Sequence, residues 1–184
     1  MGELRIVAGR WGRRRLRAPS GRWMRPTSER VREAWMNALG PDLPGARVVD
    51  LFAGSGALGL EALSRGAAHV TFVERDGRVL ECLKANIAAL DALDETDVSA
   101  LDVFEYLRRR VFYDIALADP PYGHGHATRL ITRFIEEPFA RLLCIEHGAR
   151  EKVPTPEGVV RRRYGDTVIT FVTSGDIDMS EEDK

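Results

Sequence analysis

The stretch that decides the fold reads Val48-Val49-Asp50-Leu51-Phe52-Ala53-Gly54-Ser55-Gly56-Ala57-Leu58-Gly59. Its apolar start predicts a buried strand, its glycines predict a tight loop, and the residues that follow, up to Arg65, predict a helix. Gly54, Gly56 and Gly59 have the G-x-G-x-x-G spacing of nucleotide-binding β-α-β units. Glycines at such positions let a ligand approach the backbone, because no Cβ is in the way. The stretch therefore predicts an α/β fold that binds a nucleotide-like ligand.

The glycine loop alone does not distinguish between ligands, because a dinucleotide dehydrogenase shows the same spacing. Further along, the apolar segment 69–73 ends at Glu74, where a carboxylate can hold two ribose hydroxyls. Two other features favour S-adenosylmethionine over NAD. They are Asp50, in the strand before the loop, and the tetrapeptide Asp119-Pro120-Pro121-Tyr122 at the fourth predicted strand. We therefore expect S-adenosylmethionine as the cofactor.

This tetrapeptide follows the apolar run 115–118, where a buried strand would end in a loop. Two consecutive prolines fix two φ angles and remove two N–H donors, so the backbone is stiff and presents carbonyl oxygens. The carboxylate before this corner and the aromatic ring after it can hold a planar amino group and the ring that carries it. Methylation of an exocyclic amine of a nucleobase requires such a cradle. The alternative is a proline-rich turn in which Asp119 is an ordinary turn residue.

Strands and helices alternate on either side of these motifs, which predicts a mostly parallel sheet covered on both faces. The predicted strands are 47–52, 69–74, 96–100, 114–118 and 142–146. The predicted helices lie near 57–65, 76–90, 102–109 and 127–137. Residues 159–164 and 167–173 predict a C-terminal antiparallel hairpin around Gly165-Asp166. At the N-terminus, residues 4–8 and 14–18 can pair as a small hairpin, and a helix follows from Pro26 to about Leu39.

Composition indicates one soluble domain. A chain of 184 residues with 44% hydrophobic content can bury a core. No apolar run approaches the ~18 residues that a membrane helix needs, and the arginine-rich N-terminus does not resemble a signal peptide. Cys82 and Cys144 are isolated, which is typical of reduced thiols. We expect a cytoplasmic monomer that does not associate with membranes.

The N-terminal 32 residues are strongly basic. They contain ten arginines against two glutamates, a net charge of +8, and the whole chain carries −1, so the rest carries −9. Arginines without lysines favour bidentate phosphate recognition, and Trp11 and Trp23 can stack on bases. The alternative is a solvated arm without a partner. We expect this arm to bind RNA and to contribute little to the fold, through six candidate residues: Arg5, Arg10, Arg13, Arg14, Arg15 and Arg25.

Taken together, these motifs resemble the RsmD-type ribosomal RNA methyltransferases, which transfer a methyl group from S-adenosylmethionine to guanine N2 in small-subunit rRNA. The resemblance covers roughly residues 3–173. It rests on Arg5-Ile6-Val7-Ala8-Gly9, Arg15-Leu16, Arg25-Pro26-Thr27, Arg30-Val31-Arg32-Glu33-Ala34, Asp50-Leu51-Phe52-Ala53-Gly54-Ser55-Gly56, Asp119-Pro120-Pro121-Tyr122 and Tyr164-Gly165-Asp166-Thr167. The glycine loop and Asp-Pro-Pro-Tyr are shared with many amino-methyltransferases, and the N-terminal segments are the specific part.

The resemblance implies a Rossmann-like, class I methyltransferase fold: a doubly wound, mostly parallel seven-stranded sheet with an N-terminal basic hairpin-helix extension and a C-terminal hairpin. We expect the chain to divide into a basic RNA-binding extension (1–40), a methyltransferase domain (41–174) and an acidic tail (175–184). The tail is not part of the resemblance, and its polar composition predicts disorder. Five residues are implied in cofactor binding: Asp50, Gly54, Gly56, Glu74 and Asp102. Of these, Glu74 would take the ribose hydroxyls and Asp102 would lie beside the adenine.

The resemblance also implies that Asp119, Pro120 and Tyr122 hold the target base. An exocyclic amine is a poor nucleophile because its lone pair is delocalised into the ring. Hydrogen bonds to the Asp119 carboxylate and the Pro120 carbonyl would hold the amine in line with the methyl group. A fixed carboxylate would also stabilise the positive charge that develops on nitrogen. Tyr122 would hold a base extruded from its stack.

Several other polar residues are weaker candidates. His124 and His126 suggest a metal site, but no third ligand lies at suitable spacing nearby, and we expect no metal. Glu146 and His147 end the fifth predicted strand, where a structural role is the more natural interpretation. Asn37 either reaches the cofactor or is an exposed polar residue.

Two alternatives to an rRNA guanine-N2 methyltransferase remain. A DNA or RNA amino-methyltransferase acting on adenine N6 or cytosine N4 would use the same Asp-Pro-Pro-Tyr chemistry. DNA enzymes of this kind usually carry a separate sequence-reading domain, for which 184 residues leave no room. A non-catalytic RNA-binding protein with a vestigial cofactor fold is the other alternative, and the intact motifs argue against it. The expected partner is ribosomal RNA or the small ribosomal subunit.

Overall fold

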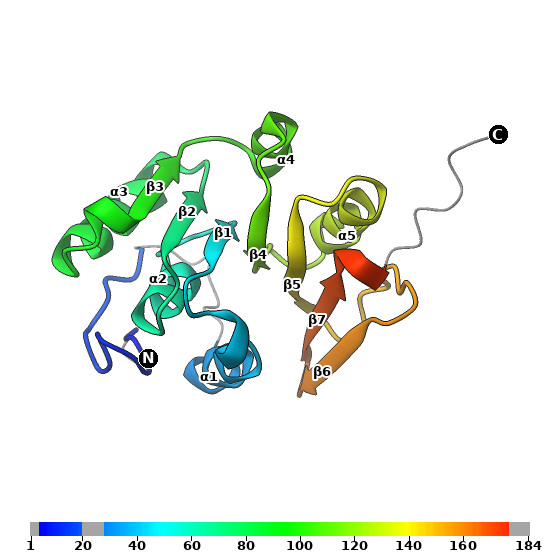
Figure 1. Ribbon diagram of the computed structural model, residues 1–184, viewed down its shortest axis with the longest axis horizontal. Coiled ribbons are helices and arrows are strands. Elements are labelled where there is room, and N and C mark those ends of the chain that lie inside the picture. The colour runs from blue at the N-terminus through cyan, green and yellow to red at the C-terminus, as the bar shows by residue number, and fades with distance from the viewer. Residues whose placement is uncertain (1–3, 20–27, 177–184) are drawn as a thin grey trace.

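The computed structural model describes residues 4–19 and 28–176, and within them a seven-stranded sheet forms the centre of the molecule (Figure 1). The strand order is β3-β2-β1-β4-β5-β7-β6. In chain order the strands are β1 (Arg47–Leu51), β2 (His69–Val73), β3 (Thr96–Ser99), β4 (Tyr113–Ala118), β5 (Ala140–Gly148), β6 (Val160–Tyr164) and β7 (Thr167–Thr173). Strands β1 to β5 are parallel, and β7 and β6 add an antiparallel hairpin. The predicted α/β sheet with its C-terminal hairpin is confirmed.

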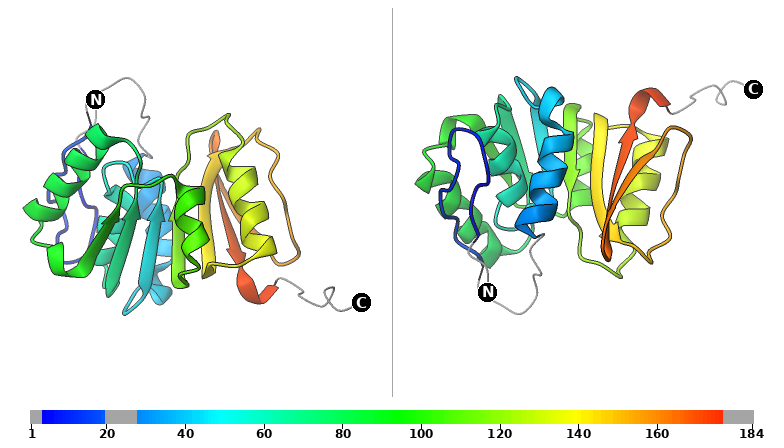
Figure 2. Two further views of the ribbon diagram at one scale, coloured as in Figure 1. Left: turned by 90° about the horizontal axis from the view of Figure 1, so that it is seen from above. Right: turned by 90° about the horizontal axis from the view of Figure 1, so that it is seen from below.

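Helices cover both faces of this sheet (Figure 2). The helices are α1 (Glu29–Ala38), α2 (Ala57–Ser64), α3 (Gly77–Ala89), α4 (Val103–Tyr106) and α5 (His126–Glu136). Apolar side chains of α1, α2 and α3 share one buried cluster on one face, whereas those of α4 and α5 share a second cluster on the other. The sheet is therefore doubly wound, as the alternation predicted.

Most element bounds lie within one or two residues of the predicted ones. The largest difference is in β5, which is longer at both ends than the predicted 142–146. The extra length has partners at both ends: Ala140 aligns with Tyr113 of β4, and β7 pairs with β5 from Leu142 to Gly148 in antiparallel register. The predicted helix 102–109 consists of α4 followed by a 3-10 turn, Leu107–Arg109, which ends at a left-handed residue, Arg110.

The register brings the carboxyl ends of three strands together. Leu51, the last residue of β1, aligns with Val73 at the end of β2 and with Ala118 at the end of β4. The chain leaves β1 toward β2 on one side and returns to β4 on the other, so the strand order reverses between β1 and β4. In open α/β sheets, ligands bind in the crevice at such a switch point.

Residues 4–19, the described N-terminal part of the basic segment and called the arm from here on, form a smaller hairpin than expected. One isolated antiparallel bridge joins Arg5 and Arg15, and backbone bonds run from Ile6 N to Arg14 O (2.9 Å) and from Leu16 N to Leu4 O (2.8 Å). Ile6 and Leu16 are buried in the same cluster as α1 and α2. The expectation that the arm contributes little to the fold is therefore wrong.

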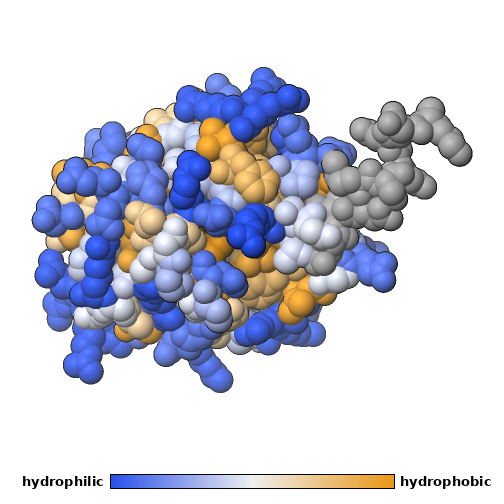
Figure 3. All heavy atoms as spheres, viewed as in Figure 1, coloured by the Kyte–Doolittle hydropathy of each residue, from blue (hydrophilic) through white to orange (hydrophobic). Residues whose placement is uncertain are grey.

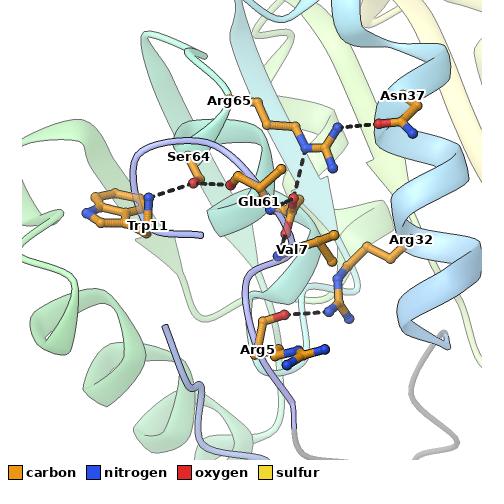
Figure 4. A network of polar contacts seen from close by, with 9 residues as sticks. Arg5, Val7, Trp11, Arg32, Asn37, Glu61, Ser64 and Arg65 are labelled. Atoms are coloured by element: carbon orange, nitrogen blue, oxygen red, sulfur yellow. Dashed lines mark hydrogen bonds and ion pairs between the residues drawn. The ribbon is translucent and has the colours of Figure 1, made fainter. Parts of the chain in front are cut away.

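The arm is held on α2 by a buried carboxylate (Figure 4). Glu61 is fully buried and accepts hydrogen bonds from Val7 N (2.6 Å), Ala8 N (3.0 Å) and Arg65 Nε (2.8 Å). At the end of α2, Ser64 Oγ accepts from Trp11 N. Unpaired backbone N–H groups are costly to bury, so these contacts let the arm pack closely on the helix.

Close approach also explains one glycine of the arm. Gly9 has a φ of +81°, and a Cβ at this position would lie 1.8 Å from the carbonyl oxygen of Ser64. No other residue type fits there without moving the arm away from α2.

Ser28 caps α1, and its side chain accepts from Val31 N; the predicted helix start at Pro26 and the acidic tail from 177 on lie outside the described residues. The face seen in Figure 3 is largely hydrophilic at its periphery, and apolar residues gather toward its middle. No helix among the described residues is long and apolar enough to cross a membrane.

Candidate active site

A cleft of about 830 Å³ lies at the carboxyl ends of β1, β2 and β4. Six of the residues singled out from the sequence line it: Gly54, Glu74, Asp102, Asp119, Pro120 and Tyr122. Leu4, Pro19 and Arg32 also line it, so the arm and α1 contribute to the wall. A second hollow of about 630 Å³, between α4 and α5, meets the cleft at Asp102 and contains none of the other five.

The glycine loop and the end of β2 are tied together through Glu74. Gly54 N donates to Glu74 Oε2 (3.0 Å), and Asp76 N donates to Glu74 Oε1 (2.9 Å). Gly54 and the preceding Phe52 both have positive φ, 56° and 60°, so the loop makes a sharp left-handed turn here. These bonds fix the carboxylate at the rim of the cleft, where a ligand with hydroxyl groups can reach it.

Asp50 lies beneath this loop and is almost completely buried, with 1% exposure. Its carboxylate accepts from Gly59 N (2.9 Å) and thereby holds the start of α2 on β1. Burial raises the pKa of Asp50 well above its ordinary value, and the charges of Asp119 and Glu74 raise it further. Asp50 therefore lies close enough to Asp119 and to Glu74 for the charges of both to act on it. Asp50 and Gly56 are not among the residues that line the cleft.

Asp102 has two roles visible in the structure. It is the N-cap of α4 and accepts from Phe104 N (2.9 Å), and it forms an ion pair with Arg75 (3.2 Å). Asx caps of this kind stabilise helix starts. The side chain is partly exposed and lines the cleft, so a ligand can also reach it.

Tyr122 is held from below by the C-terminal part of the sheet. Its hydroxyl donates a short hydrogen bond to Glu146 Oε1 and lies 3.2 Å from Thr167 Oγ1. Burial and the bond to Glu146 raise the pKa of the Tyr122 hydroxyl. The residue as a whole remains 42% exposed, so its ring still faces the cleft mouth.

Sequence reasoning missed this function of Glu146. The carboxylate is 4% exposed, lies on β5 beside β4 and lines the cleft. One signal in the sequence could have indicated this role. Glu146 follows the apolar run of a predicted parallel strand, as Asp119 does, and the carboxyl ends of parallel strands meet at one edge of the sheet.

The two histidines form part of an aromatic row. The His126 ring lies 5.5 Å from Phe52 and 6.3 Å from Phe104, and His124 lies 5.9 Å from His126. Burial lowers the pKa of His126, and the neighbouring His124 lowers it further. No group of three His, Cys, Asp or Glu residues suited to a metal ion occurs in residues 4–19 and 28–176. The row instead ties the loop after β4 to the loop after β1.

The remaining candidates lie away from the cleft. Asn37 Oδ1 accepts from Arg65 Nη1 (2.7 Å) and is absent from the cleft lining. In the arm, Arg5 pairs with Glu29 (2.8 Å) and Arg10 with Glu95 (2.5 Å). Arg14 Nη2 donates to Ala89 O (2.9 Å). Arg13, Arg14 and Arg15 are exposed, and Arg25 lies outside the described residues.

Comparison with known proteins relates this site to one family. The family described as conserved hypothetical protein 95 matches residues 4–173. Ribosomal RNA small subunit methyltransferase D of Escherichia coli (strain K12) is 41% identical over 124 residues, which make up 67% of this chain and 63% of the relative. The match therefore spans less than two thirds of that relative's length. The protein of the same name from Haemophilus influenzae is 36% identical over 163 residues, 85% of this chain and 84% of the relative.

A solved structure agrees with the sequence comparison. The Escherichia coli protein titled "putative methyltransferase yhhF" superposes with a TM-score of 0.80 at 33% identity, and the match covers 92% of this chain and 97% of that one. The shared fold thus covers most of this chain.

Proposed function

Because this chain belongs to the RsmD family, the one described as conserved hypothetical protein 95, we propose that it methylates ribosomal RNA of the small subunit with S-adenosylmethionine. The specific target that we propose is the exocyclic N2 of a guanine. One observation carries the proposal: a single cleft contains both the glycine loop and the Asp-Pro-Pro-Tyr corner. The names of the relatives, which specify small-subunit rRNA, support the substrate class.

The cleft suits S-adenosylmethionine in size and in charge. Its volume of about 830 Å³ lies within the ~300–1,000 Å³ of small-molecule sites. The carboxylates of Glu74 and Asp119, which line the cleft, favour a ligand that carries positive charge, as a sulfonium does. Glu74 would accept from the ribose hydroxyls, and Asp102 would lie beside the adenine. When bound, S-adenosylmethionine supplies an electrophilic methyl group.

The chain's own residues would orient the guanine. The Asp119 carboxylate and the Pro120 carbonyl accept hydrogen bonds from the exocyclic amine and align its nitrogen for attack. As positive charge develops on that nitrogen, the fixed carboxylate stabilises the transition state more than the ground state. Tyr122, held by Glu146, provides the surface against which an extruded base rests. The half-buried corner also limits the access of water to the amine.

Product analysis tests this proposal. The full-length protein is incubated with isotope-labelled S-adenosylmethionine and small-subunit rRNA from a strain that lacks the gene, and the digested RNA is examined by mass spectrometry. We expect labelled N2-methylguanosine. Labelled N6-methyladenosine or N4-methylcytidine would show an amino-methyltransferase with a different base, and an absence of label in every nucleoside would refute the methyltransferase proposal.

Calorimetry tests the cofactor separately. S-adenosylmethionine or its demethylated product should bind, and Glu74→Ala should weaken binding by roughly 1.5–3 kcal/mol per lost charge-assisted hydrogen bond. Glu81→Ala, on the exposed side of α3, is a matched control. Tight NAD binding without any response to S-adenosylmethionine would contradict the assignment.

A further inference from the structure

Strand β6 carries three consecutive arginines, Arg161, Arg162 and Arg163, on the free edge of the sheet. All three are exposed, and the strand contains no acidic residue. From this edge we infer a second RNA-binding surface, which holds the phosphates of the strand that leaves the active-site cleft past Tyr122. The inference rests on the proposed function, because it presumes that the target base belongs to an RNA chain.

Neutral groups hold these three arginine side chains in place, and no acidic side chain in the described part of the chain pairs with them. Arg161 Nη2 donates to Thr155 Oγ1 (2.5 Å), Arg163 Nε donates to Gly165 O (2.9 Å), and the Arg162 guanidinium lies 5.7 Å from the centre of the Phe171 ring. Each of these partners is neutral. Among the residues that the structure describes, none of the three arginines forms an ion pair, whereas Arg5 and Arg10 of the arm do. The β6 edge therefore keeps its full +3 charge for an external anion.

The position of the edge connects it to the chemistry. Tyr164, the last residue of β6, pairs with Thr167, the first residue of β7, and the Thr167 hydroxyl lies 3.2 Å from the Tyr122 hydroxyl. The C-terminal end of β6 thus lies at the cleft mouth, and the three arginines that precede Tyr164 extend away from it along the edge. Successive side chains of a strand point to opposite faces, so Arg161 and Arg163 share one face, about 7 Å apart at roughly 3.3 Å per residue, and Arg162 lies on the other. Arg161 and Arg163 can therefore meet neighbouring phosphates, and Arg162 adds its charge from the other face of the edge.

This surface lies opposite the N-terminal arm. The arm packs on α2 beside α3, and the β6–β7 hairpin lies at the other end of the sheet (Figure 1). The cleft lies at the ends of β1, β2 and β4, in the central part of the strand order. An RNA chain whose base enters the cleft must continue on both sides of it. One flank can meet the arm, and the other can meet the arginines of β6.

The test measures RNA binding by the full-length protein as a function of salt. The variant replaces all three arginines with glutamine (R161Q/R162Q/R163Q), and the matched control removes three arginines that follow α4 (R108Q/R109Q/R110Q). These control arginines are exposed and lie just before β4, at the amino end of the sheet; Arg108 lines the second hollow, and Arg110 pairs with Glu137 (3.2 Å). The probe is a short fluorescein-labelled single-stranded RNA, and melting temperature and S-adenosylmethionine affinity are recorded for each protein.

We expect the slope of log affinity against log salt to flatten by up to about two units in the β6 variant, at roughly 0.7 per lost phosphate contact. The control should keep the wild-type slope. A triple lysine variant should restore most of the slope, and the KM for small-subunit rRNA should rise in the glutamine variant while kcat stays close to wild type.

Three outcomes would overturn the inference. An equal flattening in the control would show a general effect of net charge. An unchanged slope would place the RNA elsewhere. An unchanged slope together with self-association would show that the arginines only keep the free edge from pairing with another copy.

If the triple variant fails to fold, Arg162→Glu, which alters a residue in contact with the Phe171 ring, must still weaken RNA binding. Binding is measured without turnover, so a protein that binds RNA through β6 and methylates nothing would contradict the proposed function and not this surface.

Discussion

Single carboxylates in the cleft differ in role because their surroundings differ. Asp50 is buried beneath the glycine loop, Glu74 is fixed by two backbone amides, and Asp119 lies half-buried at the rigid proline corner. The three side chains carry the same carboxylate group, yet only Asp119 lies at the corner that we propose to hold the target base. The proposed division of labour therefore assigns transition-state stabilisation to Asp119 alone.

Asp119→Ala should abolish most turnover and leave cofactor affinity nearly intact. Loss of a preorganised electrostatic group costs on the order of 10²–10³ in rate. Single-turnover methylation measures the rate and calorimetry measures the affinity. Methylation near the wild-type rate would show that Asp119 is not the residue that holds the amine.

Tyr122 and Glu146 should act as one unit. Tyr122→Phe removes the hydroxyl that donates to Glu146, and Glu146→Ala removes the acceptor. A hydrogen bond to a charged group contributes about 1.5–3 kcal/mol, so each change should lower kcat at least about tenfold. The double variant should lose little more than either single one, since both remove the same contact. Glu146→Gln keeps an acceptor and should retain most of the activity. Fully additive losses would show that Glu146 does not work through Tyr122.

Asp50 should make stability depend on pH. Its pKa is raised in the folded protein, so its contribution is complete below the unfolded pKa of about 3.9 and is lost as pH rises through the folded pKa. Asp50→Asn keeps an acceptor for Gly59 N without the charge. As pH increases above about 4, the free energy of unfolding of Asp50→Asn should therefore rise relative to that of the wild type. Urea unfolding at several pH values measures this, with Glu81→Gln as an exposed control; a difference independent of pH would contradict it.

At the level of elements, the packing of α2 on β2 depends on the third glycine of the loop. A Cβ on Gly59 would lie 2.4 Å from Phe72 Cε1 and 2.8 Å from Val70 Cγ1. Gly59→Ala should therefore destabilise the protein by about 1–3 kcal/mol, as overpacking of a dense core does. Gly77→Ala, at the first position of α3, has nothing within 4 Å of the new Cβ and should be neutral or slightly stabilising. Equal melting temperatures for the two variants would refute this reading of the glycine motif.

Most elements could be predicted because their signals are local. The glycine loop, the proline corner and the Gly165-Asp166 turn each act within a few residues, and the apolar runs between them are short enough to be strands. The contacts of Glu61 with the arm and of Glu146 with Tyr122 could not be predicted in the same way. Both join segments far apart in the chain, and neither carboxylate differs in its local sequence from an exposed one.

At the level of the whole molecule, the basic N-terminal segment has a buried backbone and exposed arginine side chains. The arm is basic, but its backbone is integrated into the core and some of its arginines pair with acidic residues of the main domain. Stability and the RNA binding that we propose for this segment are therefore separable. Backbone contacts to Glu61 serve the first, and the exposed Arg13, Arg14 and Arg15 are the candidates for the second.

Replacing Arg13, Arg14 and Arg15 by alanine should flatten the salt dependence of RNA binding by up to about two units, at roughly 0.7 per lost phosphate contact. Melting temperature and S-adenosylmethionine affinity should barely change, because these side chains are exposed and do not line the cleft. Glu61→Ala should behave in the opposite way. It leaves Arg65 and two backbone amides without their buried partner, which costs about 3–5 kcal/mol of stability. An unchanged slope with intact RNA affinity in the arginine variant would move the RNA off the arm, to the β6 edge or to the loop at 123–126, and would leave the +8 charge of the first 32 residues without a function.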